Sequence, residues 1–465
     1  MKILKARWRA LTILLLLGLG QLPREALAVP SFASQTGQPC ASCHVGAFGP
    51  QLTPFGRAFK IGGYTLGGGD GLQASIPLSA FALGSFNNTS KNLPAGTQPQ
   101  HYDVNNNPAL DQISIFLAGR VNDHVGGFMQ FTYSDINNAF HLDQVDLRPY
   151  TTTFDVAGNE LRVGATINNV PTVTDPFNST FAWGYPYVLS SLAPSPTAQP
   201  ILVNGFVGNS IGLTGYGWYN RSLYVEAGGY QTLSPYALAR LGTTYGAGQS
   251  QGVAPYLRAA YEWNWNNQSA HVGALFMQAG VYPLASERLA DPSNGSNQYT
   301  DAAVDAGYQF FGDGTQTFDV YGIYVREHQA LKGSAASQNQ ANGTAYGSSY
   351  DLNQIRMSTS YWYQNTYGAT IAWQKTWGPA NPVLYGAAPV YGSANAKPNS
   401  NAFIFEADWV PFGKDGSWAG PWANLKLGVQ YTAYTEFNGA ATNYDGFGRN
   451  ASDNNTVYLF SWLAF

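Results

Sequence analysis

The chain has 465 residues, of which 45% are apolar, 14% aromatic and only 11% charged, with 52 glycines and a formal net charge of −4. Soluble domains carry about 25% charged residues and disordered chains carry few aromatics, so the composition fits neither class. After the N-terminal segment no run approaches the roughly 18 apolar residues of a spanning helix, which excludes a helical membrane protein. The acidic balance gives no basis for binding nucleic acid, because phosphate contacts need clustered Lys and Arg. The composition is typical of a transmembrane β-barrel.

Residues 1–28 have the pattern of a signal peptide for secretion. A basic start is followed by an apolar stretch from Leu11 to Leu19 and by the small-residue cleavage sequence Ala26-Leu27-Ala28. The apolar stretch is too short for a membrane anchor. We therefore expect an exported protein whose mature chain begins near Val29.

Both cysteines of the chain lie in one motif, Cys40-Ala41-Ser42-Cys43-His44. In a C-x-x-C-H sequence the two thiols can bond to the two vinyl groups of a haem while the adjacent imidazole binds the iron. The alternative is a disulfide between Cys40 and Cys43, but it leaves His44 without a role and lacks the βαβ surroundings of a thioredoxin. The motif predicts one covalent haem c, bound by Cys40, Cys43 and His44, in a monohaem cytochrome c segment over residues 29–73.

From residue 74 to residue 465 the chain repeats segments of about ten alternating residues, separated by turns and polar loops. In 257–265 and 403–409 the odd positions are apolar and most even positions are polar, so one face meets lipid and the other water. Sixteen strands are predicted, an even number as in bacterial single-chain barrels. They are 74–86, 110–121, 124–134, 142–154, 160–168, 209–219, 222–231, 254–265, 269–280, 300–311, 316–328, 351–363, 366–376, 402–412, 424–437 and 455–465.

The expected fold is therefore all-β, a 16-stranded antiparallel transmembrane β-barrel of porin type in the bacterial outer membrane, preceded by the short c-type haem segment. Short connections after every second strand, such as Asn220-Arg221 and Gln364-Asn365, lie at one end of the barrel. Short turns face the periplasm in such barrels, so the haem segment is expected at the periplasmic end.

The lumen of a sixteen-stranded barrel is wide enough for an aqueous channel. Alternation places charged residues such as Glu262, Glu406 and Asp408 on the inner face, where we expect them to keep the channel wet or to guide a cation inward. The proline-rich loop 169–208 is either folded into the lumen as a constriction or disordered outside the barrel.

The second axial ligand of the haem iron has no local candidate among His and Met, because residues 29–73 contain no other His and no Met. His124 and His271 each follow a periplasmic turn and point inward by the parity of their strands, and Met277 shares the face of His271. The candidate distal ligands are His124, His271 and Met277.

A set of short sequences in the haem segment resembles the N-terminus of the fused monohaem cytochrome-porins of iron-oxidising bacteria. They are Pro30-Ser31-Phe32-Ala33, Gln35-Thr36-Gly37, Cys40 to His44, Phe55-Gly56-Arg57-Ala58-Phe59-Lys60 and Gly63-Tyr64-Thr65. The resemblance implies an outer-membrane protein that takes electrons from an external donor, Fe(II) in the best-known members, and passes them through its haem to periplasmic carriers. The chain departs from the family after the motif, where Val45-Gly46-Ala47-Phe48-Gly49-Pro50 lacks the second His that those oxidases carry.

Three functions remain open at this point. The first is an electron-transfer protein, a barrel with one haem c that connects an external donor such as Fe(II) with periplasmic electron carriers. The second is a general or specific diffusion porin in which the haem segment is a plug. The third is an enzyme, an Fe(II)-oxidising cytochrome. We favour the first, whose expected partners are the donor, the carriers and outer-membrane lipid, with no role for nucleic acid.

Overall fold

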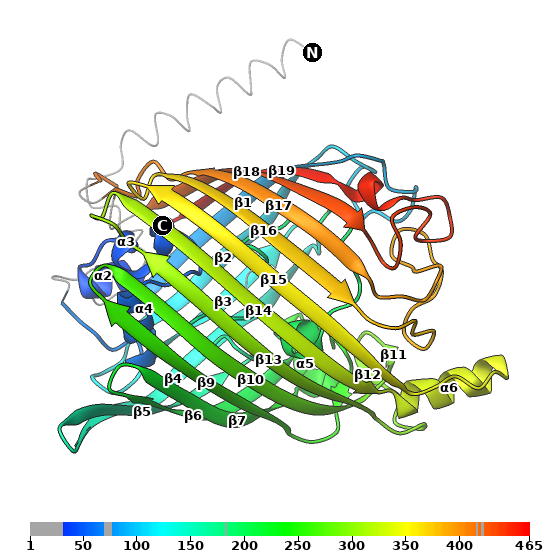
Figure 1. Cartoon of the computed structure of the whole chain (residues 1–465), viewed down its shortest axis with the longest axis horizontal. Helices are drawn as coiled ribbons and strands as arrows, with labels where there is room; N and C mark the ends of the chain where they lie inside the picture. Colours follow the sequence, from blue (N-terminus) through cyan, green and yellow to red (C-terminus); the bar gives the residue numbers. More distant parts are fainter. Residues whose placement is uncertain (1–30, 69–76, 182–183, 415–416, 420–422) are drawn as a thin grey trace, which may run out of the picture.

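The structure is a computed structural model of the chain that describes residues 31–68, 77–181, 184–414, 417–419 and 423–465. The predicted signal peptide and the first residues of the first predicted strand lie outside these ranges. The fold is a closed antiparallel β-barrel, because β1 pairs with β2 on one side and with the last strand, β19, on the other (Figure 1). None of the helices in the described ranges is long and apolar enough to cross a membrane.

All sixteen predicted strands are present, and most of their ends shift by only one to three residues from the predicted ones. The two-residue strand β8 joins the same sheet, and β11 and β12 form a small separate hairpin. The barrel strands are β1 (Leu78–Thr89), β2 (Asn107–Arg120), β3 (Gly126–Ser134), β4 (Ala139–Val156), β5 (Asn159–Asn168), β6 (Ser210–Tyr219), β7 (Leu223–Thr232), β9 (Ala254–Trp265), β10 (Gln268–Tyr282), β13 (Asn297–Phe310), β14 (Gln316–Ala330), β15 (Ser349–Tyr363), β16 (Tyr367–Trp377), β17 (Ser400–Trp409), β18 (Asn424–Glu436) and β19 (Thr456–Ala464).

The predicted short turns form at one end of the barrel. Asn220 and Arg221 between β6 and β7, and Gln364 and Asn365 between β15 and β16, have positive φ angles between 48° and 53°. Two successive residues with positive φ give a turn whose twist matches that of paired strands, and Asn accepts this conformation more readily than most residues.

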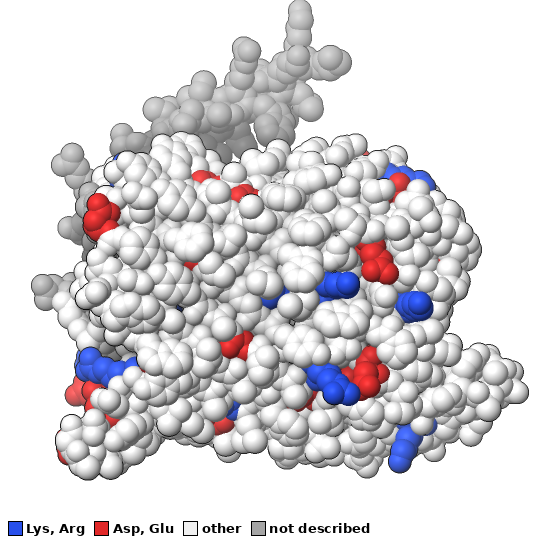
Figure 2. Space-filling view, in the orientation of Figure 1, with Lys and Arg blue, Asp and Glu red and all other residues white. Residues whose placement is uncertain are grey.

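The outer surface of the barrel is apolar and the inner surface is polar. Exposed residues alternate with buried ones along β9, where Leu257, Tyr261 and Trp263 face outward while Arg258 and Glu262 are buried. Figure 2 shows only scattered charged groups on the face in view. A closed barrel with this distribution is the architecture of bacterial outer-membrane proteins, and the chain is accordingly an outer-membrane β-barrel.

The described part of the predicted haem segment lies at the end of the barrel where the chain terminates (Figure 1). It consists of α2 (Ser31–Thr36), α3 (Cys40–Cys43), the 3-10 turn η1 (Val45–Ala47) and α4 (Pro54–Ile61). Its side chains contact the inner wall at widely separated strands, as described below, so this segment is a plug of the periplasmic end. We call residues 31–68 the plug.

The connection between β5 and β6 is folded into the lumen, which confirms the first of the two alternatives for the loop 169–208. Thr172, Thr174 and Asp175 have no exposed surface, and Ile201 and Leu202, at the start of the short helix η3 (Ile201–Gly205), are also buried. The remaining long connections, with α5 (Pro235–Leu241), α6 (Lys332–Asn342) and η4 (Ala451–Asn454), lie at the opposite, external end (Figure 1).

Candidate haem-binding site

The C-x-x-C-H motif forms one helical turn and its cap. Cys40 and Cys43 are the first and last residues of α3, so a spacing of three residues places both thiols on the same side of the turn. The backbone N–H of His44 donates to the Cys40 carbonyl at 2.9 Å and closes the turn. Both cysteines are free thiols and half-buried.

The imidazole of His44 has one hydrogen-bonding contact, with the backbone of Gly49. Its Nδ1 atom is buried and has no hydrogen-bond partner, and burial lowers the pKa of the ring to about 4. The imidazole is therefore neutral, which is the form that ligates iron. Burial also raises the pKa of Cys43 to about 12, the opposite of the low pKa of a catalytic thiol. Two free thiols on one turn, followed by a neutral imidazole, fit covalent attachment and proximal ligation of a haem.

The motif is supported from one side by α4. Thr53 caps this helix by accepting a hydrogen bond from the Gly56 N–H, and its own N–H donates to the Cys43 carbonyl at 2.9 Å. A Cβ atom at Gly56 would lie 2.3 Å from the Cys43 carbonyl oxygen. The close approach of α3 and α4 therefore requires glycine at this position.

The residues after the motif pack on aromatic side chains of the wall. Phe48 contacts Trp462 of β19 edge to face, with ring centroids 4.9 Å apart. A Cβ atom at Gly46 would lie 2.3 Å from the indole of Trp362 in β15. The Asn424 amide of β18 donates to the Ala47 carbonyl at 2.7 Å. The motif thus faces the part of the wall formed by β15, β18 and β19.

Arg57 anchors the other half of the plug through a buried ion pair. Its Nη2 atom lies 2.7 Å from Oε1 of Glu262 in β9, and both side chains are almost fully buried. The guanidinium also donates to Ser269 and Gln309 of the wall at 2.8 and 2.9 Å, and to the Leu52 carbonyl. This anchor was not predicted from the sequence. The signal for it was a basic residue, Arg57, in a segment expected next to a barrel wall with inward carboxylates.

The end of the plug is fixed to the wall between β2 and β6. The Tyr64 hydroxyl donates to Asp146 of β4 at 2.7 Å, and Asp146 pairs with Arg148 at 2.9 Å. The Tyr216 hydroxyl of β6 donates to the Ile61 carbonyl at 2.7 Å. The plug is therefore attached around much of the inner circumference.

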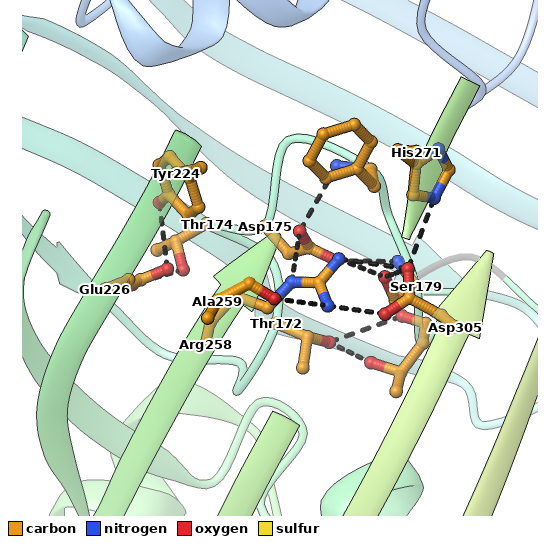
Figure 3. Close-up of polar contacts among 12 residues, drawn as sticks. Thr172, Thr174, Asp175, Ser179, Tyr224, Glu226, Arg258, Ala259, His271 and Asp305 are labelled. Carbon is orange, nitrogen blue, oxygen red and sulfur yellow. Dashed lines mark hydrogen bonds and ion pairs between the residues drawn. The ribbon is translucent and has the colours of Figure 1, made fainter. Parts of the chain in front are cut away.

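The loop between β5 and β6 lies against the plug and is held by a charged network (Figure 3). Asp175 accepts from Arg258 of β9 at 3.1 Å, and Arg258 also pairs with Asp305 of β13. Ser179 donates to Asp305 at 3.1 Å. Lys60 of the plug donates to the Asp175 carbonyl at 2.9 Å, so the loop connects plug and wall.

The inward carboxylates expected to keep a channel wet are instead paired with basic side chains. Glu262 pairs with Arg57, whereas Glu406 and Asp408 lie 2.9 and 3.0 Å from Nζ of Lys426. The expectation that these three carboxylates face water in an open channel is therefore wrong. Arg57 of the plug and Lys426 of the wall neutralise them, and alternation along the strands does not predict such pairs.

The candidate distal ligands lie in three different surroundings. His124 is exposed at the periplasmic rim, where Nδ1 contacts the Thr151 carbonyl at 2.8 Å and the ring borders a cleft beside α4. His271 is buried, and its Nε2 atom lies 3.2 Å from Asp305. Met277 is fully buried in an apolar cluster with Leu202 and Phe206. Distal ligation by one of the three therefore stays a prediction.

Comparison with known proteins yields likeness of architecture alone. No family model and no curated protein matches the chain. Solved structures that align with it include OprB of Pseudomonas putida, with a TM-score of 0.45 and 11% identity over 83% of this chain and 94% of that one. The outer membrane channel DcaP of Acinetobacter baumannii has a TM-score of 0.43 and 14% identity, over 83% of this chain and 96% of that one. The anion-selective porin from Comamonas acidovorans has a TM-score of 0.43 and 10% identity, over 83% of this chain and 98% of that one.

Proposed function

We propose that the protein is an outer-membrane electron-transfer protein whose plug carries one covalent haem c. The haem would connect an external electron donor, Fe(II) as the first candidate, with electron carriers of the periplasm. The observation that carries the proposal is the turn Cys40–Cys43 with His44, held inside the periplasmic end of a closed barrel.

A haem c supplies a one-electron carrier within the otherwise insulating wall of the barrel. Cys40 and Cys43 would attach it and His44 would hold its iron from one side. The Arg57–Glu262 pair and the Tyr64–Asp146 hydrogen bond keep the segment in one place. The loop around Asp175 covers the plug from within the barrel and limits the access of water.

The direct test is to purify the full chain from outer membranes and to record its pyridine haemochrome and redox spectra with and without Fe(II). We expect a c-type spectrum that an added donor reduces, and none from the matched C40S/C43S variant. A c-type spectrum that is indifferent to Fe(II) would keep electron transfer and reject iron as the donor. A purified barrel without haem would overturn the proposal.

The same protein tests the distal ligand. The variants H124Q, H271Q and M277L each remove one candidate, and only the loss of a true ligand should change the spectrum of the oxidised haem and shift its midpoint potential. If all three variants keep the wild-type spectrum, the sixth position is filled by another group or by solvent.

A diffusion porin is the alternative, and the sixteen-stranded barrel favours it because such a barrel is wide enough for solutes. Proteoliposome swelling separates the two functions. Flux of small solutes through the wild-type protein at the rate of an open porin would support the alternative, whereas tight liposomes that pass electrons to an enclosed acceptor would support the conduit. Catalytic turnover with Fe(II) alone would identify an Fe(II)-oxidising enzyme.

A further inference from the structure

Five basic residues of the plug and the barrel wall are buried in the described part of the chain; a further buried one, Arg449, lies in the loop between β18 and β19 and donates to backbone carbonyls. Four of the five form close ion pairs within the described part of the chain, and the fifth, Arg356, does not. The pairs are Arg57 with Glu262, Arg148 with Asp146, Arg258 with Asp175 and Asp305, and Lys426 with Glu406 and Asp408.

Arg356 lies on the inner face of β15 and is 6% exposed. Its Nε atom is buried without a hydrogen-bond partner, and none of the described carboxylates forms an ion pair with it. Its guanidinium lies over the Tyr185 ring, 5.4 Å from the centroid. Burial of a charge without a counter-ion is strongly unfavourable, so an anion at this position would stabilise the guanidinium.

The neighbours of Arg356 add further donors without acceptors. Ser358, two residues along β15, has a buried hydroxyl with no partner. Tyr321, which is paired with Ser358 across β14 and β15, also has a buried hydroxyl without a close partner, with Ser179 of the lumen loop nearby. Gln374 lies directly opposite Arg356 on β16. Unpartnered buried polar groups are rare in folded proteins, and here they gather on neighbouring positions of β14 and β15.

The guanidinium of Arg356 borders an apolar cluster. Tyr185 of the lumen loop packs with Ala372 of β16 and Ile404 of β17 in one buried cluster, next to the guanidinium. Exclusion of water strengthens an ionic hydrogen bond, and a guanidinium binds carboxylates and similar oxyanions through two parallel bonds.

We propose that Arg356, with the hydroxyls of Ser358 and Tyr321, binds a carboxylate or another oxyanion in the lumen. The same chemistry has two sources, a propionate of the haem or a small soluble anion. Trp362, which packs on Gly46 of the plug, lies on the same strand, six residues or about 20 Å along β15 from Arg356, so the experiment below decides between the two sources. The site itself does not depend on the haem, so the two proposals can fail separately.

The test uses full-length protein in detergent and succinate as the probe, with binding measured by calorimetry. C40S/C43S protein should bind succinate, and adding R356Q should weaken binding at least about thirtyfold, because one partner of a buried charge pair is removed. R356K keeps the charge and should retain measurable binding. R326Q is the matched control, since Arg326 lies on β14 with a 62% exposed side chain, and it should have no effect.

The same binding measurement on protein with intact cysteines distinguishes the two sources of the anion. Succinate binding in this protein as well identifies a soluble anion. Binding restricted to C40S/C43S, together with a shift of the haem midpoint potential caused by R356Q, identifies a propionate. The proposal is overturned if succinate binds in neither protein and R356Q leaves the potential unchanged, or if R356Q leaves the succinate affinity of a folded barrel unchanged.

Discussion

The two halves of the plug are attached to the barrel in different ways. The motif half, residues 40–48, touches the wall mainly through Phe48 and Gly46, which pack on tryptophans, and through one amide hydrogen bond to a backbone carbonyl. The anchor half, residues 53–64, is held by a buried ion pair and by hydrogen bonds that involve charged groups, from Arg57 to Glu262 and from Tyr64 to Asp146. Strength of attachment is therefore concentrated away from the cysteines.

The anchor half therefore holds the plug in the barrel, whereas the motif half is the part proposed to bind the haem. Buried charges near a haem shift its potential, so an anchor made of charges is better placed on the far half of the plug. The direct contacts of the motif half are aromatic rings and one neutral amide, and the nearest fixed charges, those of Lys426 and its carboxylate partners, lie behind the Trp362 ring. We therefore expect substitutions in the anchor half to change the stability of the plug, and those in the motif half to change haem attachment.

The largest effect on stability is expected for Arg57→Ala. Removal of the guanidinium leaves Glu262 buried without a counter-ion, which costs about 3–5 kcal/mol in comparable pairs. The plug should then leave the wall at lower denaturant concentration than the barrel unfolds. Limited proteolysis along a urea series, with fragments identified by mass, measures this release.

The double variant R57A/E262A is the matched control. It removes the uncompensated carboxylate as well and should recover a large part of the loss. If the single and the double variant release the plug at the same urea concentration, the ion pair is not the anchor and the distinction between the two halves is lost.

Tyr64→Phe should have the next largest effect. It removes a hydroxyl that donates to the buried Asp146, the partner of Arg148, and hydrogen bonds to charged groups contribute about 1.5–3 kcal/mol. The same assay applies. Tyr102→Phe removes a similar bond, to Asp135 at 2.9 Å, in an exposed external loop, and should leave plug release unchanged. Equal effects of both variants would contradict a specific role of Tyr64.

Local sequence patterns predicted the barrel well and the contents of its lumen less well. Alternation with a period of two and Asn-rich turns are properties of neighbouring residues, so all sixteen strands could be predicted from them. The Arg57–Glu262 pair joins residues 205 positions apart. Parity showed that Glu262 points inward, but it carries no information on which segment fills the lumen, so water and a plug were equally compatible with the same pattern.

The candidate site divides in the same way. Cys40, Cys43 and His44 are adjacent in sequence, and their chemistry is defined by their spacing. A distal ligand or a lumen anion depends on side chains from distant strands. Alternation along the strands places both Arg356 and Arg258 on the inner face, and only the missing counter-ion in the folded chain distinguishes Arg356 from the paired Arg258.

Gly46→Ala examines the motif half. The added Cβ would collide with the Trp362 indole, and overpacking of this kind costs about 1–3 kcal/mol beyond the strain of a positive φ of 68°. We expect reduced haem attachment with little change in the urea concentration of plug release. Gly49→Ala is a close control, because Gly49 has a φ of 94° but no atom within 4 Å of the added Cβ. Reduced attachment in both variants to the same degree would assign the effect to backbone strain alone.

The smallest effect is expected for Arg221→Gln, which breaks an ion pair at the same periplasmic end as the anchor. Arg221 lies 3.1 Å from Glu160, but its side chain is 71% exposed in the turn between β6 and β7. Solvent and salt screen such pairs, which contribute at most about 1 kcal/mol. Plug release and haem spectrum should both match the wild type. The Arg221–Glu160 pair has the same chemistry as Arg57–Glu262, but it is exposed and does not join the plug to the wall. If R221Q released the plug at a urea concentration as low as R57A does, the charge of the rim, rather than the buried contact, would hold the plug.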